Sequence, residues 1–236
     1  MPTRLPAPFA VESLVPYFRR KNYYLVVSLS FSILIPAVIG LVRWRRINPA
    51  YYPFLSLLWL GSFNELLSFF LIRNGHSNSV NNNIFSLLES VLVTLQFYRW
   101  RLFGQAKGLF FILQLTFVFF WITETFFFST IRLFASYFII FHSLAIVFMA
   151  TAMINQLLGN ERQQLLRHST FLICIGLIVF FTYAILIEVS YVYGSAWSTS
   201  LKTSVVRIMA FINLFSNLVY AFAVLWMPRR FGYTLT

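Results

Sequence analysis

Seven long apolar runs, separated by short polar joints, constrain the fold of this sequence more than any other feature. A helix that crosses a bilayer needs about 20 mostly apolar residues, because each residue adds about 1.5 Å along the axis. The runs cover residues 24–42, 52–72, 84–102, 108–128, 133–157, 169–190 and 204–227. They do not alternate as the strands of a membrane barrel do. Since backbone amides in lipid must pair within their own segment, each run is predicted to be a helix.

The composition agrees with lipid as the solvent for most of the surface. Apolar residues make up 59% of the chain and charged residues only 10%, whereas soluble domains carry about 25% charged residues. The net charge of +12 comes from basic residues scattered over short joints. That pattern favours contact with anionic lipid headgroups and excludes a nucleic-acid-binding surface. The sequence therefore predicts an all-α integral membrane protein, a bundle of seven transmembrane helices.

Three parts are expected along the chain. Residues 1–23 contain several prolines and a basic cluster, Arg19–Lys21, which favours an interfacial tail over a span. A cleaved signal peptide is the rival interpretation of this region. Residues 24–227 are expected to form the transmembrane domain, and residues 228–236 a basic cytoplasmic tail. The single cysteine, Cys174, lies in an apolar run and excludes an intramolecular disulfide.

The basic residues indicate which way the bundle faces, because Lys and Arg accumulate in cytoplasmic loops. With the N-terminus outside, the inner side holds Arg43, Arg45, Arg46, Arg99, Arg101, Lys107, Arg162, Arg167, Arg229 and Arg230. The outer loops then hold only Arg73, Arg132, Lys202 and Arg207. Basic residues of the N-terminal tail oppose this assignment. We expect the N-terminus outside and the C-terminus in the cytoplasm, with the bundle in the inner (plasma) membrane of the cell.

Acids inside the spans are the informative residues, because a charge at the centre of a span costs about 2.5–3.5 kcal/mol. Four of the six glutamates fall in the outer third of their spans, at positions that connectivity places on one side of the membrane: Glu65, Glu89, Glu124 and Glu188. Polar stripes on other spans should turn toward the same interior. The predicted ligand-binding residues of an outward-facing polar pocket are Asn64, Glu65, Glu89, Gln96, Glu124, His142, Glu188, Arg207, Asn213 and Asn217.

Two interpretations of these polar residues stay open. They are either structural contacts between helices, Glu–Arg pairs and Asn hydrogen bonds worth about 0.6 kcal/mol each, or they line a pocket for a ligand, ion or proton. For His142 alone a structural role is favoured. The histidines His76, His142 and His168 fall at different levels, which argues against a three-histidine zinc site. The chain has no nucleophile-elbow, zincin, CxxC or P-loop motif, and no metal or cofactor is predicted.

Three parts of the sequence carry a family resemblance: NNNIFSLLESVLVTLQFYRW, the RNG-rich polar loop before it, and FINLFSNLVYAFAVLWMPRR. The matching residues are Leu87, Leu88, Glu89, Phe97, Tyr98, Asn213 or Asn217, and the tail Met227–Arg230. In these residues the chain resembles an uncharacterised family of seven-helix bacterial inner-membrane proteins. The resemblance implies a seven-helix fold in a bacterial plasma membrane and implies no activity. The long proline-rich N-terminal tail departs from the family.

Three functions are consistent with the sequence. The first is a receptor-like or sensor-like module that signals through a cytoplasmic protein partner. The second is a transporter or channel for a small solute or ion, which needs a polar path across the whole bilayer. The third, an enzyme acting on lipid with Glu65 or Glu89 as general base, has no accompanying nucleophile or metal ligand set. The first is favoured, and the oligomeric state is not predicted.

Overall fold

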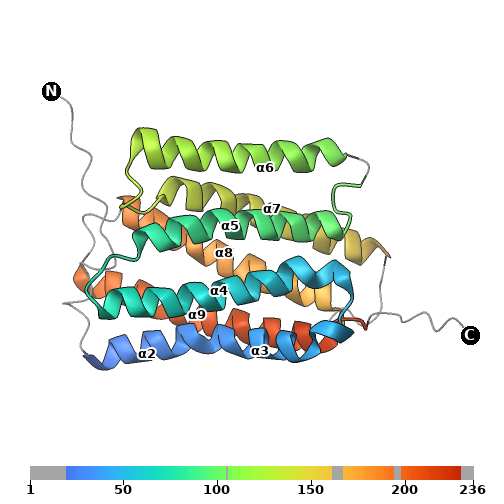
Figure 1. Cartoon of the computed structure of the whole chain (residues 1–236), viewed down its shortest axis with the longest axis horizontal. Helices are drawn as coiled ribbons and strands as arrows, with labels where there is room; N and C mark the ends of the chain where they lie inside the picture. The colour runs from blue at the N-terminus through green and yellow to red at the C-terminus, as the bar shows by residue number, and fades with distance from the viewer. Residues whose placement is uncertain (1–19, 105, 161–166, 194–197, 230–236) are drawn as a thin grey trace, which may run out of the picture.

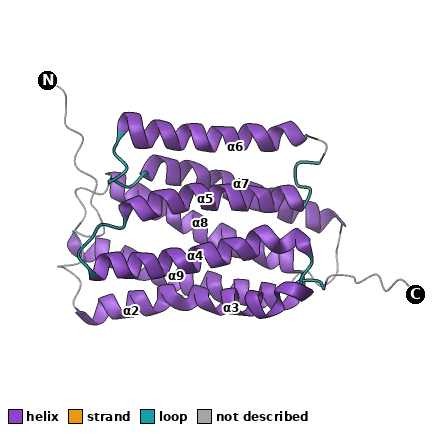
Figure 2. Cartoon of the chain, in the orientation of Figure 1, coloured by secondary structure: helices purple, strands orange, loops and turns teal. Residues whose placement is uncertain are grey.

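The structure of the protein is a computed structural model that describes residues 20–104, 106–160, 167–193 and 198–229. Within these ranges it is built of helices without a strand, as Figure 2 shows, and has one isolated β-bridge between Ile47 and Arg229. The long helices lie side by side, and successive helices run in opposite directions (Figure 1). The all-α prediction is confirmed for the described residues.

The helices follow one another with short connections. Their bounds are α2 (Arg20–Ser30), η2 (Phe31–Ile33), α3 (Leu34–Arg43), η3 (Trp44–Arg46), η4 (Pro49–Tyr51), α4 (Tyr52–Arg73), α5 (Ser79–Arg99), α6 (Lys107–Ile122), the π-helical turn η5 (Thr123–Phe128), α7 (Ser136–Asn160), α8 (Ser169–Tyr193) and α9 (Thr199–Trp226). Six segments are long and apolar enough to cross a membrane: Leu25–Arg46, Pro49–Arg73, Lys107–Phe128, Ser136–Gly159, Ser169–Tyr193 and Ser204–Trp226. The chain is therefore a multi-pass membrane protein.

Helix α5 is the expected span that differs from the prediction. It begins at Ser79, five residues before the expected start at residue 84, and it is not among the six apolar segments. Its first turns contain three consecutive asparagines, Asn81, Asn82 and Asn83, which the sequence assigns to a loop. The structure keeps them helical because their side chains bond to neighbouring elements, as described below.

The first apolar segment is interrupted near its middle. Pro36 has no N–H to donate to the carbonyl of Ser32 one turn earlier, and its ring crowds that carbonyl. The chain tightens into the 3₁₀ turn η2 at Phe31–Ile33 and resumes as α3. Helix α4 approaches closely at this turn, since a Cβ added to Gly61 would lie 2.5 Å from Cδ1 of Ile33. A larger residue at position 61 would therefore require the Ile33 side chain to move.

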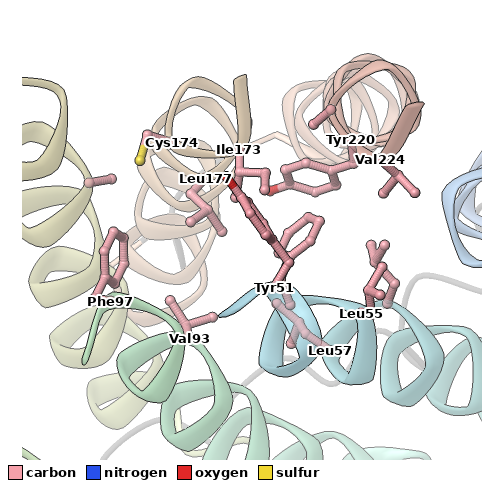
Figure 3. Close-up of a cluster of buried hydrophobic side chains, with 14 of the residues drawn as sticks. Tyr51, Leu55, Leu57, Val93, Phe97, Ile173, Cys174, Leu177, Tyr220 and Val224 are labelled. Carbon is pink, nitrogen blue, oxygen red and sulfur yellow. The ribbon is translucent and has the colours of Figure 1, made fainter. Parts of the chain in front are cut away.

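The main core lies where α4, α5, α7, α8 and α9 meet. Figure 3 shows side chains from these helices converging, among them Val93, Leu177 and Tyr220. The Tyr220 ring packs on the backbone of Gly176, where an added Cβ would overlap with the ring. Phe54 meets the same ring edge to face, with centroids 5.2 Å apart. This contact joins α9 to both α8 and α4.

The two ends of the bundle differ in charge. The connections α4–α5 and α6–α7 lie at one end, on the left in Figure 1, together with the last turn of α8 and the first turn of α9. We call this the acidic end, because its neighbouring helical turns carry Glu65, Glu124 and Glu188. Glu89 was expected in the outer third of its span, but α5 begins at Ser79, so Glu89 lies at the midpoint of the helix, ten residues from each end. The opposite, basic end carries Arg43, Arg45, Arg46, Arg99, Arg101, Lys107, Arg167 and Arg229. The predicted tails at residues 1–23 and 228–236 fall almost wholly outside the described residues.

Candidate functional site

One face of α5 turns polar side chains into the bundle. These buried residues recur at steps of three and four, which places them on one side of a helix: Asn83, Ser86, Ser90 and Thr94, with Glu89 at the edge of the face. The opposite side carries an exposed apolar stripe, Val80, Ile84 and Leu88. Helix α5 is thus polar toward its neighbours and apolar toward the surroundings of the bundle.

Glu89 of α5 meets His142 of α7 inside the bundle. Nε2 of His142 lies 3.5 Å from Oε2 of Glu89. This distance is within the range of an ion pair and longer than a good hydrogen bond. His142 is 1% exposed and Glu89 is 9% exposed. Two ionisable side chains from different helices therefore face each other with little access to water.

The other ring nitrogen of His142 fixes the tautomer. Nδ1 lies 3.0 Å from the carbonyl oxygen of Phe138, and a carbonyl only accepts hydrogen bonds. Nδ1 must therefore carry a hydrogen. In the neutral ring Nε2 then presents a lone pair to the Glu89 carboxylate, and the two repel unless one proton lies between them.

The surroundings of the Glu89–His142 pair are mostly aromatic. Phe138 stacks on the His142 ring at 5.0 Å, and Phe181 of α8 meets it edge to face at 5.8 Å. Tyr220 of α9 lies close enough to Glu89 to interact with its charge. In the part of the chain that the structure describes, no Lys or Arg lies within 4.0 Å of the Glu89 carboxylate. The balance of charge at this point depends on His142.

Glu124 caps helix α7. Its two carboxylate oxygens accept hydrogen bonds from the backbone N–H groups of Tyr137, at 3.0 Å, and Phe138, at 2.5 Å. These groups lie in the first turn of α7, where N–H groups lack helical partners and the helix dipole favours negative charge. Glu188 of α8 lies near Glu124, and the Ser136 hydroxyl is within its reach. This pair of acids is arranged around the start of α7.

Asn83 is a buried residue that the predicted site did not include. Its Nδ2 donates to the carbonyls of Ile131, at 3.0 Å, and Leu133, at 2.7 Å, while its Oδ1 accepts from Ala135 N–H at 3.0 Å. Nε1–H of Trp121 on α6 donates to the backbone carbonyl of Asn83 at 2.9 Å. Asn83 therefore holds the α6–α7 connection against α5. Its spacing of three and seven from Ser86 and Ser90 is the sequence signal that identifies it.

Asn64 and Glu65 are neighbours in the sequence with different surroundings. Asn81 Nδ2 donates to Asn64 Oδ1 at 2.8 Å and to Ser68 Oγ at 3.0 Å, which joins α4 to α5. Asn64 itself donates to Asn82 Oδ1 at 3.4 Å. Asn64 is thus part of an asparagine network between the helices. Glu65 is half-buried on the next position of α4 and lies apart from the Glu89–His142 pair.

Gln96 and Arg207 do not join the other predicted site residues. Gln96 lies toward the basic end, where its Nε2 donates to the Ala50 carbonyl and its Oε1 accepts from Phe54 N–H, both at 2.8 Å. It thereby holds the start of α4, because an amide can serve one acceptor and one donor at once. Arg207 of α9 is exposed. Both residues were expected in the outward-facing pocket.

Asn213 and Asn217 of α9 lie beside the interrupted first segment. Asn217 Nδ2 donates to Ser32 Oγ at 2.9 Å and to Asn213 Oδ1 at 3.1 Å. Ser32 belongs to the 3₁₀ turn η2, so the two asparagines pack where the first segment changes its helix type. The predicted site residues therefore divide into separate groups, and among the described residues Glu89–His142 is the group that brings an acid and a base within 4.0 Å of each other.

Neither a metal site in the described residues nor a similarity to known proteins assigns a function to the chain. Within the described ranges, no group of three or more His, Cys, Asp or Glu residues is placed to hold a metal ion. No family model, no curated protein and no solved structure matches the chain. The Glu89–His142 pair is therefore assigned as the candidate functional site on its geometry alone.

Proposed function

We propose that this chain is a seven-span, sensor-like membrane protein whose responding element is the Glu89–His142 pair. A change in the proton content of the pair would alter how α5 packs on α7, and the change would reach a cytoplasmic protein partner at the basic end. The observation that carries the proposal is the 3.5 Å contact between Nε2 of His142 and Oε2 of Glu89. Both side chains are buried, and no described Lys or Arg lies within 4.0 Å of the Glu89 carboxylate.

Helix α5 is the seventh span in this proposal. It has 21 residues, which is long enough to cross the hydrocarbon core. Its low apolar content is explained by the polar face that it turns toward other helices, while Val80, Ile84 and Leu88 are exposed. Seven spans put the two termini on opposite sides, and the basic end favours the N-terminus outside and the C-terminus in the cytoplasm of a plasma membrane.

Two helices connect the pair to the far end of the bundle. Glu89 lies on α5, which ends at Arg99, and His142 lies on α7, which ends at Asn160. Both helices end at the basic end. With one proton the pair is neutral overall, and gain or loss of a proton leaves an unbalanced buried charge that is costly in low dielectric. Relief of that cost by a shift of α7 against α5 is the proposed signal.

The test measures the spacing of these helices at the basic end. Spin labels are attached through Arg99→Cys and Leu158→Cys, two exposed positions, in a Cys174→Ala background and in lipid nanodiscs. We expect the label distance to differ between about pH 5 and pH 8, the interval in which histidines ordinarily change charge. Glu89→Gln should abolish the difference. The matched control His76→Gln, at an exposed histidine of the acidic end, should retain it.

Two results would overturn the sensor proposal. One is an identical distance distribution at both pH values in the otherwise unmodified protein. The other is a pH-dependent difference that survives Glu89→Gln. The partner is tested separately by purification in mild detergent, where a cytoplasmic protein should co-purify in a fixed ratio and be released by substitutions at the basic end.

A transporter is the second candidate, and the interrupted first segment favours it. Broken helices near the middle of a span mark the binding sites of many transporters, and η2 is such a break, bonded to Asn217 of α9. Proton flux into proteoliposomes with a pH-sensitive dye tests this function. Flux that stops in Asn217→Leu and in Glu89→Gln would favour transport over sensing, and flux that continues in Glu89→Gln would remove Glu89 from the mechanism.

A further inference from the structure

Backbone pairing at the basic end brings three arginines together. Ile47 and Arg229 form an antiparallel bridge, and Asn48 N–H donates to the Pro228 carbonyl at 3.0 Å. This pairing places the segment that follows η3 against the segment that follows α9. Arg46 and Arg229 consequently lie close enough to Arg43 to repel it electrostatically.

Arg43 differs from Arg46 and Arg229 in burial and in hydrogen bonding. Arg43 is half-buried, and its Nη1 donates to the carbonyls of Val224, at 2.6 Å, and Leu225 at the end of α9. It is therefore committed to the helix terminus. Arg46 and Arg229 are exposed. Within the described ranges neither guanidinium group makes a hydrogen bond, so both have donors for a group outside the protein.

Nothing in the described part of the chain balances these charges. None of the described acids lies at the basic end, since Glu65, Glu124 and Glu188 lie toward the acidic end and Glu89 lies at the midpoint of α5. Like charges that are held together by backbone hydrogen bonds are stabilised when an anion binds between them. Guanidinium groups suit phosphate oxygens because they donate two parallel hydrogen bonds.

The adjacent aromatic residues place this cluster at the level of lipid headgroups. Trp44 stacks on Tyr52, with ring centroids 4.1 Å apart, and lies 4.7 Å from the Trp59 ring. Trp and Tyr collect at the boundary between hydrocarbon and water. Trp44 is also two residues from Arg46. An anion that binds to this cluster is therefore expected to lie at the level of the lipid headgroups.

We propose that Arg46 and Arg229, beside Arg43, form a binding site for the phosphate headgroup of an anionic phospholipid. The site is independent of the Glu89–His142 pair and of any signal that the pair generates. It is a defined site at one corner of the basic end, distinct from the general attraction of all basic residues to an anionic surface.

Native mass spectrometry of the full chain in detergent tests the site. The delipidated protein is titrated with phosphatidylglycerol and with phosphatidylcholine that carries the same acyl chains. We expect preferential binding of phosphatidylglycerol. The double substitution Arg46→Gln/Arg229→Gln should weaken it about 30-fold, because each arginine near an anionic surface contributes about 1 kcal/mol and 1.4 kcal/mol is tenfold.

The matched control is Arg99→Gln/Arg101→Gln, which removes two exposed arginines elsewhere at the basic end and should leave the affinity nearly unchanged. Equal losses in both double variants, or equal binding of the two lipids, would overturn the proposal. So would displacement of phosphatidylglycerol by inorganic phosphate at comparable concentration, since the ligand would then be a free anion. If the double variant does not fold, the single variant Arg46→Gln and the loss of affinity with added KCl in the unmodified protein decide the question.

Discussion

At both the acidic and the basic end of the bundle, a charged side chain stabilises a helix terminus, and the two charges have opposite sign. At the acidic end, the Glu124 carboxylate accepts hydrogen bonds from the first N–H groups of α7. At the basic end, the Arg43 guanidinium donates to the last carbonyls of α9. Each charge thereby meets the helix terminus of opposite partial charge. In both places a charged side chain satisfies backbone groups that have no helical partner.

This comparison changes the interpretation of the intramembrane acids. The sequence suggested Glu–Arg pairs as one explanation, but in the described residues no Lys or Arg lies within 4.0 Å of Glu65, Glu89, Glu124 or Glu188. Glu124 is explained by the helix terminus that it caps. Glu89 is different, because it meets an ionisable side chain, His142, and not a backbone group. The difference between Glu124 and Glu89 separates a structural acid from a candidate functional one.

The largest expected effect is on the Glu89–His142 pair. His142→Leu leaves the Glu89 carboxyl buried without its partner, and removal of one member of a buried pair costs about 3–5 kcal/mol. The double variant Glu89→Leu/His142→Leu should be more stable than the single variant, because it buries no unpaired charge. Unfolding in mixed detergent micelles, followed by circular dichroism, measures both. Equal stability of His142→Leu and the exposed control His76→Leu would show that the pair contributes nothing.

The next effect concerns the cap of α7. Glu124→Leu removes the acceptor of two backbone N–H groups, and unsatisfied buried groups cost about 1–3 kcal/mol each, so we expect a loss of about 3 kcal/mol. Glu124→Gln should lose less, since its amide oxygen still accepts from one of the two groups. Similar losses for Glu89→Gln and Glu124→Gln would remove the distinction between a structural and a functional acid.

Much of the fold follows from the sequence, because span length and apolar content are properties of single segments. The six apolar segments agree with the predicted runs, and connectivity alone places Glu65, Glu124 and Glu188 toward one end, whereas Glu89 lies at the midpoint of α5. The start of α5 does not follow. Asn81 and Asn83 are typical of a loop, and they become helical only because α4 and the α6–α7 connection accept their hydrogen bonds. These partners lie far away in the sequence, so the residues around Asn81 and Asn83 do not predict that the helix begins there.

The candidate site is predicted less completely than the fold. Glu89 and His142 were both expected in it, but their contact depends on how α5 and α7 are rotated about their axes. Gln96 shares a side of α5 with Glu89 in the sequence pattern, yet it lies seven residues further, which is about 10 Å along the axis. That distance takes it to the start of α4. Periodicity predicts the face of a helix and leaves the partner undetermined.

Gln96 provides a counterpart to Glu124 toward the basic end, with a smaller expected effect. Gln96→Leu leaves Phe54 N–H and the Ala50 carbonyl without their side-chain partner, and we expect a loss of about 2 kcal/mol. Gln96→Glu retains an acceptor for Phe54 N–H but has no donor for the Ala50 carbonyl. Its stability should therefore lie between that of the unmodified protein and that of Gln96→Leu. Chemical denaturation in micelles would measure this order, and a Leu variant as stable as the Glu variant would contradict the assigned role.

The smallest expected effect is at the end of α9. Arg43→Gln removes the charge that faces the carbonyls of Val224 and Leu225, and a favourable charge at a helix terminus contributes about 0.3–1 kcal/mol. The exposed neighbour Arg45 makes no such contact in the described structure, so Arg45→Gln should change stability by less than about 0.5 kcal/mol. Melting curves of the two variants at low and high salt compare them directly. If Arg43→Gln behaves like Arg45→Gln at both salt concentrations, only the acidic end relies on a side-chain charge to stabilise a helix terminus.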